Sequence, residues 1–161
     1  RKKEERTVNM TKDVLVSVTG TQFFGDGQDA VEIITPGTYY LKNGKHYILY
    51  DEAIADTDIV THNTVKAAPG KVEVAKNGAV ETRMVFESGK KTMANYLTPL
   101  GLIVLGLTTV DIKLREEENA VHVNVDYALE MNGEHVSNCQ IGICAQSRET
   151  AALHLSGERN G

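Results

Sequence analysis

Hydrophobic and polar residues alternate along most of the chain in short segments, which is the pattern of strands with one buried face. The clearest segment runs from Val121 to Met131, where every second residue is apolar. A similar segment lies near the start, where Val14, Val16 and Val18 alternate with mostly polar residues. Successive side chains of a strand point to opposite faces. These segments therefore predict half-buried strands and an all-β fold.

Turn signals separate the segments and leave little room for helices. Three Asn-Gly pairs, at 43–44, 77–78 and 132–133, are typical of tight β-hairpins, because both central residues of such a turn need positive φ. Pro36 indicates an edge or a bulge in the second strand, since proline cannot donate to the ladder. Parallel strands need crossovers of roughly a dozen residues, and most connections here are much shorter. We therefore expect sequential antiparallel pairing.

About ten strands with one apolar face must either pack as two sheets or close on themselves, and closure removes exposed edges. We expect an antiparallel meander β-barrel of about eight to ten strands, with a β-sandwich as the alternative. The barrel is expected to form one domain over residues 11–146. A charged tail at 1–10 precedes it, and a short helix or tail follows at 147–161.

The run from Leu102 to Leu107 breaks the alternation, because it is apolar at almost every position. A strand of this kind is usually covered on both faces. We expect the barrel core to cover one face and a partner to cover the other, with Ile103, Leu105 and Leu107 in need of that cover. A homodimer through this strand is the simplest arrangement.

Composition narrows the function classes without selecting one. The net charge of the 161 residues is -5, which argues against a nucleic-acid partner, because such proteins usually present a basic face. No apolar run is long enough for a transmembrane helix, and we expect no membrane partner. Cys139 and Cys144 fall on opposite faces of one predicted strand, so we expect free thiols. With no export signal in the sequence, this favours a cytoplasmic protein.

Two groups of residues form a family pattern. The downstream group is Phe86, Gly89, Tyr96, Thr98, Pro99, Gly101, Thr108, Thr109 and Tyr127, and the upstream group is Thr35, Gly37, Tyr39, Tyr50 and Glu52. In this order they resemble the YwiB-like family of small uncharacterised bacterial proteins, over roughly residues 14–145. Lys76 stands where that family usually has a basic residue, and the terminal segments lie outside the resemblance. The resemblance implies a calycin-like or lipocalin-like β-barrel and brings no catalytic residues.

Tyr39, Tyr50 and Glu52 form the first candidate site. Tyr50 and Glu52 share one face of a predicted strand, and Tyr39 is expected nearby across the first Asn-Gly hairpin. Together they would make a polar cluster at the barrel mouth, with Glu52 as a base or an anchoring carboxylate. The simpler interpretation is a buried tyrosine hydrogen-bonded to a neighbouring carboxylate, which stabilises the fold and has no other role.

The barrel interior is the second candidate site. Its predicted lining mixes aromatic rings with hydroxyl groups, at Phe86, Tyr96, Thr98, Thr108 and Tyr127. A barrel of about eight strands leaves room for one small ligand, and the chain has no Trp to fill the centre. The interior is therefore predicted to hold a small apolar or amphipathic ligand.

Recognisable catalytic, metal and cofactor motifs are missing from the sequence, and we assign no catalytic residue, metal ligand or cofactor. His46, His62 and His135 are isolated in the sequence and are interpreted as surface residues. The sequence thus favours a ligand-binding barrel, with a packed interaction barrel as the alternative. An enzyme with a polar site at the barrel mouth is the third and least supported hypothesis.

Overall fold

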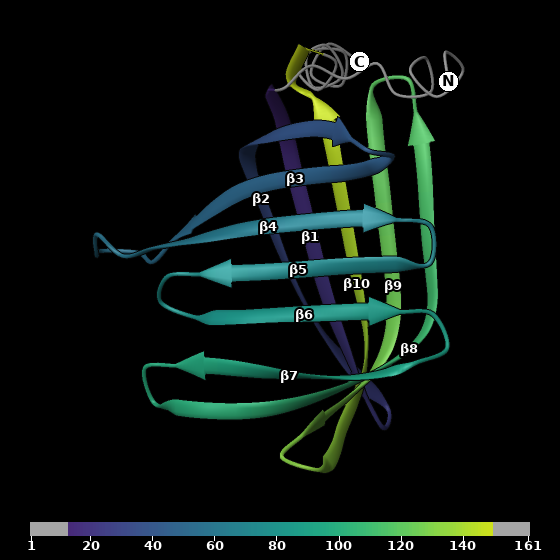
Figure 1. Cartoon of the computed structure of the whole chain (residues 1–161). Coiled ribbons are helices and arrows are strands. Elements are labelled where there is room, and N and C mark those ends of the chain that lie inside the picture. Colours follow the sequence, from purple (N-terminus) through teal and green to yellow (C-terminus); the bar gives the residue numbers. More distant parts are fainter. Residues whose placement is uncertain (1–12, 150–161) are drawn as a thin grey trace.

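Ten β-strands make up the part of the chain that the structure describes (Figure 1). The computed structural model describes residues 13–149. The strands are β1 (Asp13–Phe24), β2 (Gly27–Lys42), β3 (Lys45–Ala53), β4 (Val60–Ala68), β5 (Lys71–Asn77), β6 (Glu81–Glu87), β7 (Lys91–Thr98), β8 (Gly101–Glu117), β9 (Ala120–Met131) and β10 (Glu134–Ser147). The tail expected at 1–10 lies outside the described residues, as does most of the expected helix or tail at 147–161.

The strands form a closed antiparallel barrel in which each strand pairs with its neighbours in sequence. Closure comes from β1 and β10, whose ladder runs from the pair Val14 and Ser147 to the pair Phe23 and Asn138. In Figure 1, β3 to β7 run across the view, whereas β1, β9 and β10 run nearly at right angles to them. The predicted meander barrel is confirmed, and the alternative of a β-sandwich is not adopted.

Two of the three Asn-Gly pairs form the predicted tight hairpins. Asn43 and Asn132 have φ of 54° and 50°, and the glycine after each also has positive φ. The third pair behaves differently, because Asn77 remains in β5 and only Gly78 has positive φ. A Cβ atom on Gly78 would lie 2.3 Å from the carbonyl oxygen of Val60. Gly78 therefore permits a close approach to β4 as well as a turn.

Pro36 marks the point where β2 leaves its neighbour β3. The β2–β3 ladder begins at the pair Gly37 and Tyr50, whereas Pro36 is paired only with Leu15 of β1. The first part of β2, residues 27–36, therefore has β1 on one side and no strand on the other. The edge predicted from the proline is present, and it leaves the barrel wall incomplete at this place.

The barrel interior is densely packed at one end and open at the other. Side chains buried at the packed end come from most of the strands and include Val14, Val16, Ile48, Val65, Val72, Phe86, Val121 and Val123. Val31 of β2 points to the same side of its sheet as Val16, yet it remains 67% exposed. Its exposure follows from the missing neighbour beside residues 27–36, so this end of the barrel is accessible from outside.

The apolar run in β8 is oriented differently from the prediction. Leu105 and Leu107 are buried in the core and Ile103 packs against it, so these three residues already have cover. The outward residues are Leu102 and Val104, and Leu102 is 55% exposed. A partner on this strand would therefore meet Leu102 and Val104.

The described residues, 13–149, contain neither a helix that could span a membrane nor a cluster of side chains placed to bind a metal ion. Within this range no helix combines the length and the hydrophobicity needed to cross a membrane. The same residues contain no group of three or more His, Cys, Asp or Glu side chains placed to hold a metal ion. Cys139 is a buried free thiol and Cys144 is a half-buried free thiol on the other face of β10.

Candidate functional site

A cavity of about 290 Å³ lies in the open end of the barrel. Strands β1, β6, β7, β8 and β9 contribute its walls, and most of the lining side chains are apolar. The lining residues are Gln22, Met84, Tyr96, Ile103, Leu105, Leu107, Tyr127, Leu129 and Met131. Small-molecule sites typically measure roughly 300–1,000 Å³ and combine an apolar wall with few polar groups. The cavity is at the lower end of that range and has that composition.

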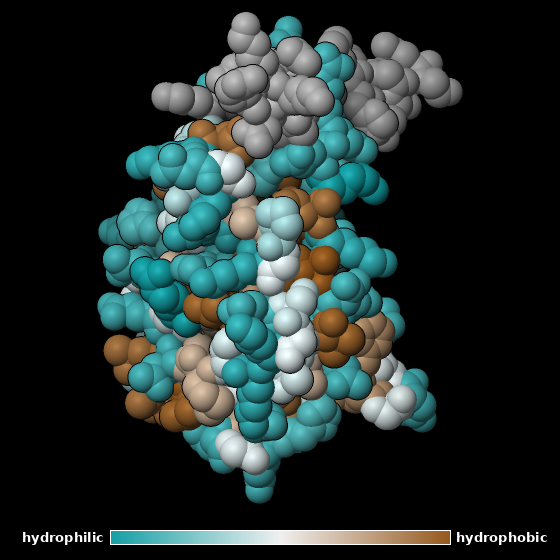
Figure 2. Space-filling model, turned by 45° about the vertical axis from the view of Figure 1, so that its right-hand side comes forward, coloured by the Kyte–Doolittle hydropathy of each residue, from teal (hydrophilic) through white to brown (hydrophobic). Residues whose placement is uncertain are grey.

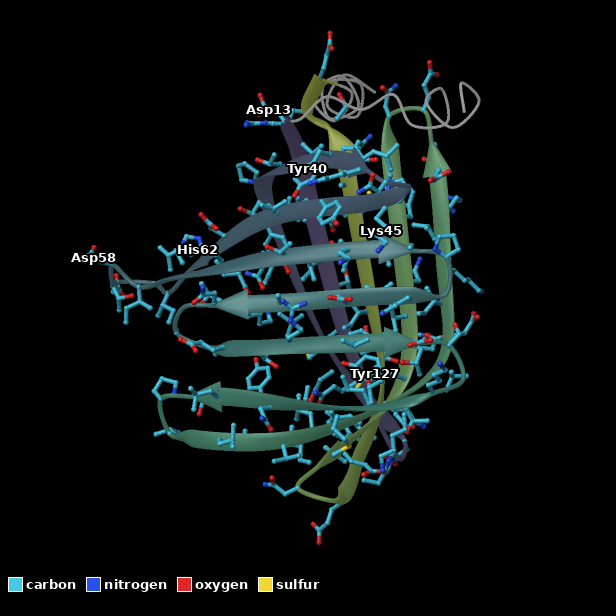
Figure 3. The ribbon with its side chains drawn as sticks, viewed as in Figure 1. Asp13, Tyr40, Lys45, Asp58, His62 and Tyr127 are labelled. Carbon is cyan, nitrogen blue, oxygen red and sulfur yellow. The ribbon has the colours of Figure 1, made fainter. Side chains whose placement is uncertain are left out.

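A second hollow of about 400 Å³ adjoins the cavity, since both include Gln22 and Tyr127 in their walls. It lies along the inner side of β1, β2 and β10 and includes Asp29 and Val31, in the part of β2 that pairs with β1 but not with β3. Figure 3 shows Tyr127 at the level of β6 and β7. The incomplete wall at β2 therefore leads toward the cavity.

Inward-pointing polar side chains form a row across five neighbouring strands at the mouth of the cavity. The pairing runs from Tyr50 to Asn63, then to Lys76, Thr82 and Tyr96. Ile103 of β8 continues the row, and both Tyr96 and Ile103 line the cavity. The next residues inward on these strands are apolar, with Ile48, Val65, Val74, Met84, Ala94 and Leu105. From one row of inward-pointing residues to the next along these strands, the interior therefore changes from polar to apolar.

Glu52 forms a hydrogen-bonded cluster with Asn63 and Lys76 of this row. Glu52 Oε1 accepts from Asn63 Nδ2 at 2.9 Å and from Lys76 Nζ at 3.1 Å. Lys76 Nζ also donates to Asn63 Oδ1 at 2.7 Å. The side chain of Lys76 is 18% exposed and that of Glu52 is 30% exposed. A partly desolvated cation is therefore held at the mouth by an anion and an amide.

The tyrosines of the open end are held in their protonated form. Burial raises the pKa of Tyr50 and Tyr96 above the ordinary value, and the negative charge of Glu52 raises both further. Burial also raises the pKa of Tyr127, with a smaller contribution from the neighbouring Cys139. Neutral tyrosines donate hydrogen bonds through their hydroxyl groups. Near neutral pH the mouth therefore presents phenol donors and no phenolate.

The eight residues predicted for the two candidate sites fall into separate places. Tyr96 and Tyr127 line the cavity. Tyr50 belongs to the polar row that reaches the cavity at Tyr96, and Glu52 is hydrogen-bonded to Asn63 and Lys76 of that row. Tyr39 and Phe86 are buried in the packed core. Tyr39 does not join Glu52, because its hydroxyl lies 2.8 Å from Nδ1 of His46. The structure thus gives the position of these residues, and the ligand-binding role of all eight remains a prediction.

Thr98 and Thr108 were predicted to line the interior, but neither of them does. The Thr98 hydroxyl closes the β7–β8 turn, accepting from the Leu100 amide at 3.1 Å and donating to the Gly101 carbonyl at 3.0 Å. Thr108 points outward, because both of its neighbours in β8, Leu107 and Thr109, are buried. The register shift between Thr109 and Asp111 lies just beyond. Thr109 is therefore the inward threonine of this pair.

His46 contradicts its interpretation as a surface histidine. It is 1% exposed, and its Nε2 lies 2.5 Å from Glu116 Oε2 while Nδ1 faces Tyr39. The two ring nitrogens of His46 therefore connect the Glu116 carboxyl group with the Tyr39 hydroxyl. His62, in contrast, is exposed (Figure 3), and its Nδ1 lies 2.8 Å from Asp51 Oδ1. His135 is also exposed.

Several residues of the site were not predicted from the sequence. Gln22, Leu129 and Met131 line the cavity, and Lys76 organises the mouth. The alternation does place Leu129 and Met131 on the face of Tyr127. No local signal identifies Lys76, because its contacts with Glu52 and Asn63 depend on the registers of three strands.

Three comparisons with known proteins agree with this fold. Residues 16–143 match the family described as "Domain of unknown function (DUF1934)". The "Uncharacterized beta-barrel protein YwiB" of Bacillus subtilis (strain 168) is 32% identical over 117 residues, which cover 71% of this chain and 80% of that protein. The crystal structure of the ywiB protein from Bacillus subtilis has a TM-score of 0.71 and 24% identity, covering 86% of this chain and 94% of the other. The predicted YwiB-like resemblance is confirmed.

Proposed function

The chain belongs to the family described as a domain of unknown function, DUF1934, and we propose that its barrel binds a small, largely apolar molecule inside the open end. The cavity between β6, β7, β8 and β9 is the observation that carries this proposal. A barrel with a purely structural role would bury its apolar residues against one another, because interiors are normally close-packed. Here Leu105, Leu129 and Met131 pack in or against the core and also line a cavity.

The location of the cavity supports binding as much as its size does. The incomplete wall beside residues 27–36 and the adjoining hollow provide a route from outside. The packed end, which includes Phe86 and Val123, closes the other side and gives the ligand a floor. A ligand held inside a barrel at one open end would be a lipocalin-like arrangement. Both cysteines are free thiols, which fits a reducing compartment. We therefore propose that the protein binds its ligand in the cytoplasm.

Binding of an uncharged apolar dye tests this proposal. N-phenyl-1-naphthylamine fluoresces more strongly in apolar surroundings, so its titration reports occupancy of the cavity. The variant Leu105→Trp places a larger side chain in the cavity, and Leu102→Trp places the same side chain on the outer face of β8. Because the chain has no Trp, each variant also carries a single fluorophore whose energy transfer to the dye reports proximity.

We expect the dye to bind the wild type and Leu102→Trp with similar affinity. We expect Leu105→Trp to weaken binding about tenfold or more, since steric exclusion removes several buried contacts. Thermal unfolding of both variants shows whether they are folded. No dye binding by a folded wild type, or equal binding by all three proteins, would contradict the proposal.

A second candidate function is association with another copy of the chain. The outer face of the β7–β8 hairpin exposes Met93, Leu97 and Leu102, and the turn exposes Leu100 completely. Figure 2 shows hydrophobic side chains gathering at the lower left, at the level of these strands. The ion pair of Lys91 with Glu130 borders this face, so both signs of charge are present beside it. A two-fold interface needs such a self-complementary patch.

Light scattering over a range of concentrations tests the dimer. We expect a dimeric mass for the wild type and a monomeric mass for Leu102→Asp, which places a charge on the exposed patch. A monomeric wild type would rule out this candidate. Leu105→Asp is unsuitable for this purpose, because Leu105 is buried in the barrel and its replacement would destabilise the fold.

A further inference from the structure

Three hydrogen-bond donors follow one another along the polar row, which reaches the cavity at Tyr96. A lysine ammonium group has three N–H donors, and those of Lys76 have two acceptors among the described residues, Glu52 Oε1 and Asn63 Oδ1. One N–H of Lys76 therefore remains. The next residue in the row is Thr82, whose hydroxyl is buried and has no hydrogen-bond partner among residues 13–149.

Tyr96 is the third donor and the one that reaches the cavity wall. Burial and the charge of Glu52 raise its pKa, so the hydroxyl keeps its proton. Thr82 is directly paired with Lys76 on one side and with Tyr96 on the other. Directly opposite residues of antiparallel strands have Cβ atoms about 5 Å apart. One small acceptor group at the mouth can therefore reach more than one of these donors.

The charge at the mouth decides which acceptor fits. Lys76 and Glu52 neutralise each other at 3.1 Å, and Asn63 between them carries no charge. A ligand carboxylate would approach Lys76 beside the carboxylate of Glu52, and a ligand ammonium would approach Glu52 beside Lys76. Like charges at short range in a partly desolvated site repel strongly. An uncharged head group avoids both conflicts.

On the basis of the proposed function, we infer that the Lys76–Thr82–Tyr96 row selects an uncharged carbonyl acceptor, such as a ketone, ester or amide, on a molecule whose apolar part fills the cavity. A carbonyl oxygen has two lone pairs and no proton, which matches a mouth with several donors to spare. The bound carbonyl would satisfy the buried Thr82 hydroxyl, and the tail would extend toward Leu105 and Leu129.

Displacement of the dye by four molecules of similar length tests this inference. The competitors are 2-nonanone, decane, octanoate and nonylammonium, which differ mainly in the head group. We expect 2-nonanone to displace the dye at about tenfold lower concentration than each of the others, as one added hydrogen bond of ordinary net strength would give.

Variants of the row identify the groups that carry the preference. We expect Thr82→Val and Lys76→Met each to reduce the advantage of 2-nonanone over decane about threefold or more, with the decane affinity unchanged. Lys66→Met is the matched control, because that lysine lies over the ring of Tyr47, away from the cavity lining. Glu52→Gln leaves Lys76 without its anion, so we expect it to shift the preference toward octanoate.

The possible outcomes distinguish a failure of this inference from a failure of the proposed function. If the dye binds but 2-nonanone and decane compete equally, the head-group inference is wrong and the cavity proposal stands. Tightest competition by octanoate or nonylammonium in the wild type likewise overturns the inference alone. If the dye and all four competitors fail to bind, the proposed function fails, and the inference fails with it. Thr82→Val keeps the test decisive if Lys76→Met does not fold, because it removes only an unpaired hydroxyl.

Discussion

Lys76 Nζ and Glu52 Oε1 lie 3.1 Å apart although the two residues belong to β5 and β3, with β4 between them. The gap is bridged by Asn63 of β4, which bonds to both side chains. The ion pair therefore depends on the registers of β3, β4 and β5 and marks one edge of the cavity mouth. It also leaves the mouth polar without giving it a net charge.

The ion pair is expected to make a modest contribution to stability. In a double-mutant cycle with Glu52→Gln and Lys76→Met, we predict a coupling energy of about 1 kcal/mol, because both side chains are partly solvated. Chemical denaturation of the four proteins measures it. The coupling should decrease at high salt, since exposed parts of the pair are screened. A coupling near zero at low salt would contradict the geometry.

His46 is expected to contribute more to stability than a typical histidine. The variant His46→Phe leaves the buried Tyr39 hydroxyl and one oxygen of Glu116 without their partner. We predict a loss of about 2 kcal/mol in the free energy of unfolding, the usual cost of an unsatisfied buried polar group. His62→Phe is the matched control: it removes a contact of an exposed ring and should change stability by less than about 0.5 kcal/mol. Equal effects of the two variants would contradict the buried role of His46.

Gly37 is expected to tolerate no side chain. A Cβ atom there would lie 2.5 Å from the Leu49 carbonyl oxygen and 2.6 Å from Cγ2 of Val16. We predict that Gly37→Ala lowers the free energy of unfolding by about 2 kcal/mol, as overpacking of a core usually does. Gly20→Ala is the control, because a Cβ atom at Gly20 meets no atom within 4 Å. Thermal or denaturant unfolding of both variants gives the comparison.

The barrel is expected to lose stability in alkaline solution. Burial raises the pKa of Tyr39, Tyr50 and Tyr127 well above the ordinary value of about 10. Between the ordinary and the raised pKa, the unfolded chain has lost protons that the folded chain keeps. The free energy of unfolding therefore falls as pH rises through this window, by up to about 1.4 kcal/mol per pH unit for each tyrosine, and it is unaffected by these groups below about pH 9.

Denaturation at several pH values measures this dependence. The variant Tyr50→Phe removes one of the three titrating groups, so its stability should fall less steeply above about pH 10 than that of the wild type. An identical slope in both proteins would contradict the assignment of Tyr50 as a proton-retaining buried group.

The fold could be predicted from the sequence because its signals are local. The alternation from Val121 to Met131 and the hairpins at Asn43 and Asn132 each depend on residues close in the chain. Because short connections require consecutive strands to pair with one another, few topologies remained possible. The orientation of β8 was harder, because Leu102 to Leu107 is apolar on both faces and the register shift near Thr109 changes the phase of the alternation.

The site could be predicted only in part, because its contacts join distant strands. Tyr96 and Tyr127 were identified from their alternation and chemistry, and both line the cavity. His46 was misassigned because its partner Glu116 lies 70 positions away in the sequence. The open end itself depends on the place where β2 and β3 separate, which the sequence marks only by Pro36.

Intermolecular NMR contacts between the bound dye and methyl groups test the central claim most directly. The inner methyl groups of Met84, Leu105, Leu129 and Met131 line the cavity, whereas Met93, Leu97 and Leu102 are exposed on the outer face. We predict nuclear Overhauser contacts from the dye to the inner set, with none to the outer set. Contacts confined to the outer set would show that the dye binds the surface of the β7–β8 hairpin and would contradict a ligand site inside the barrel.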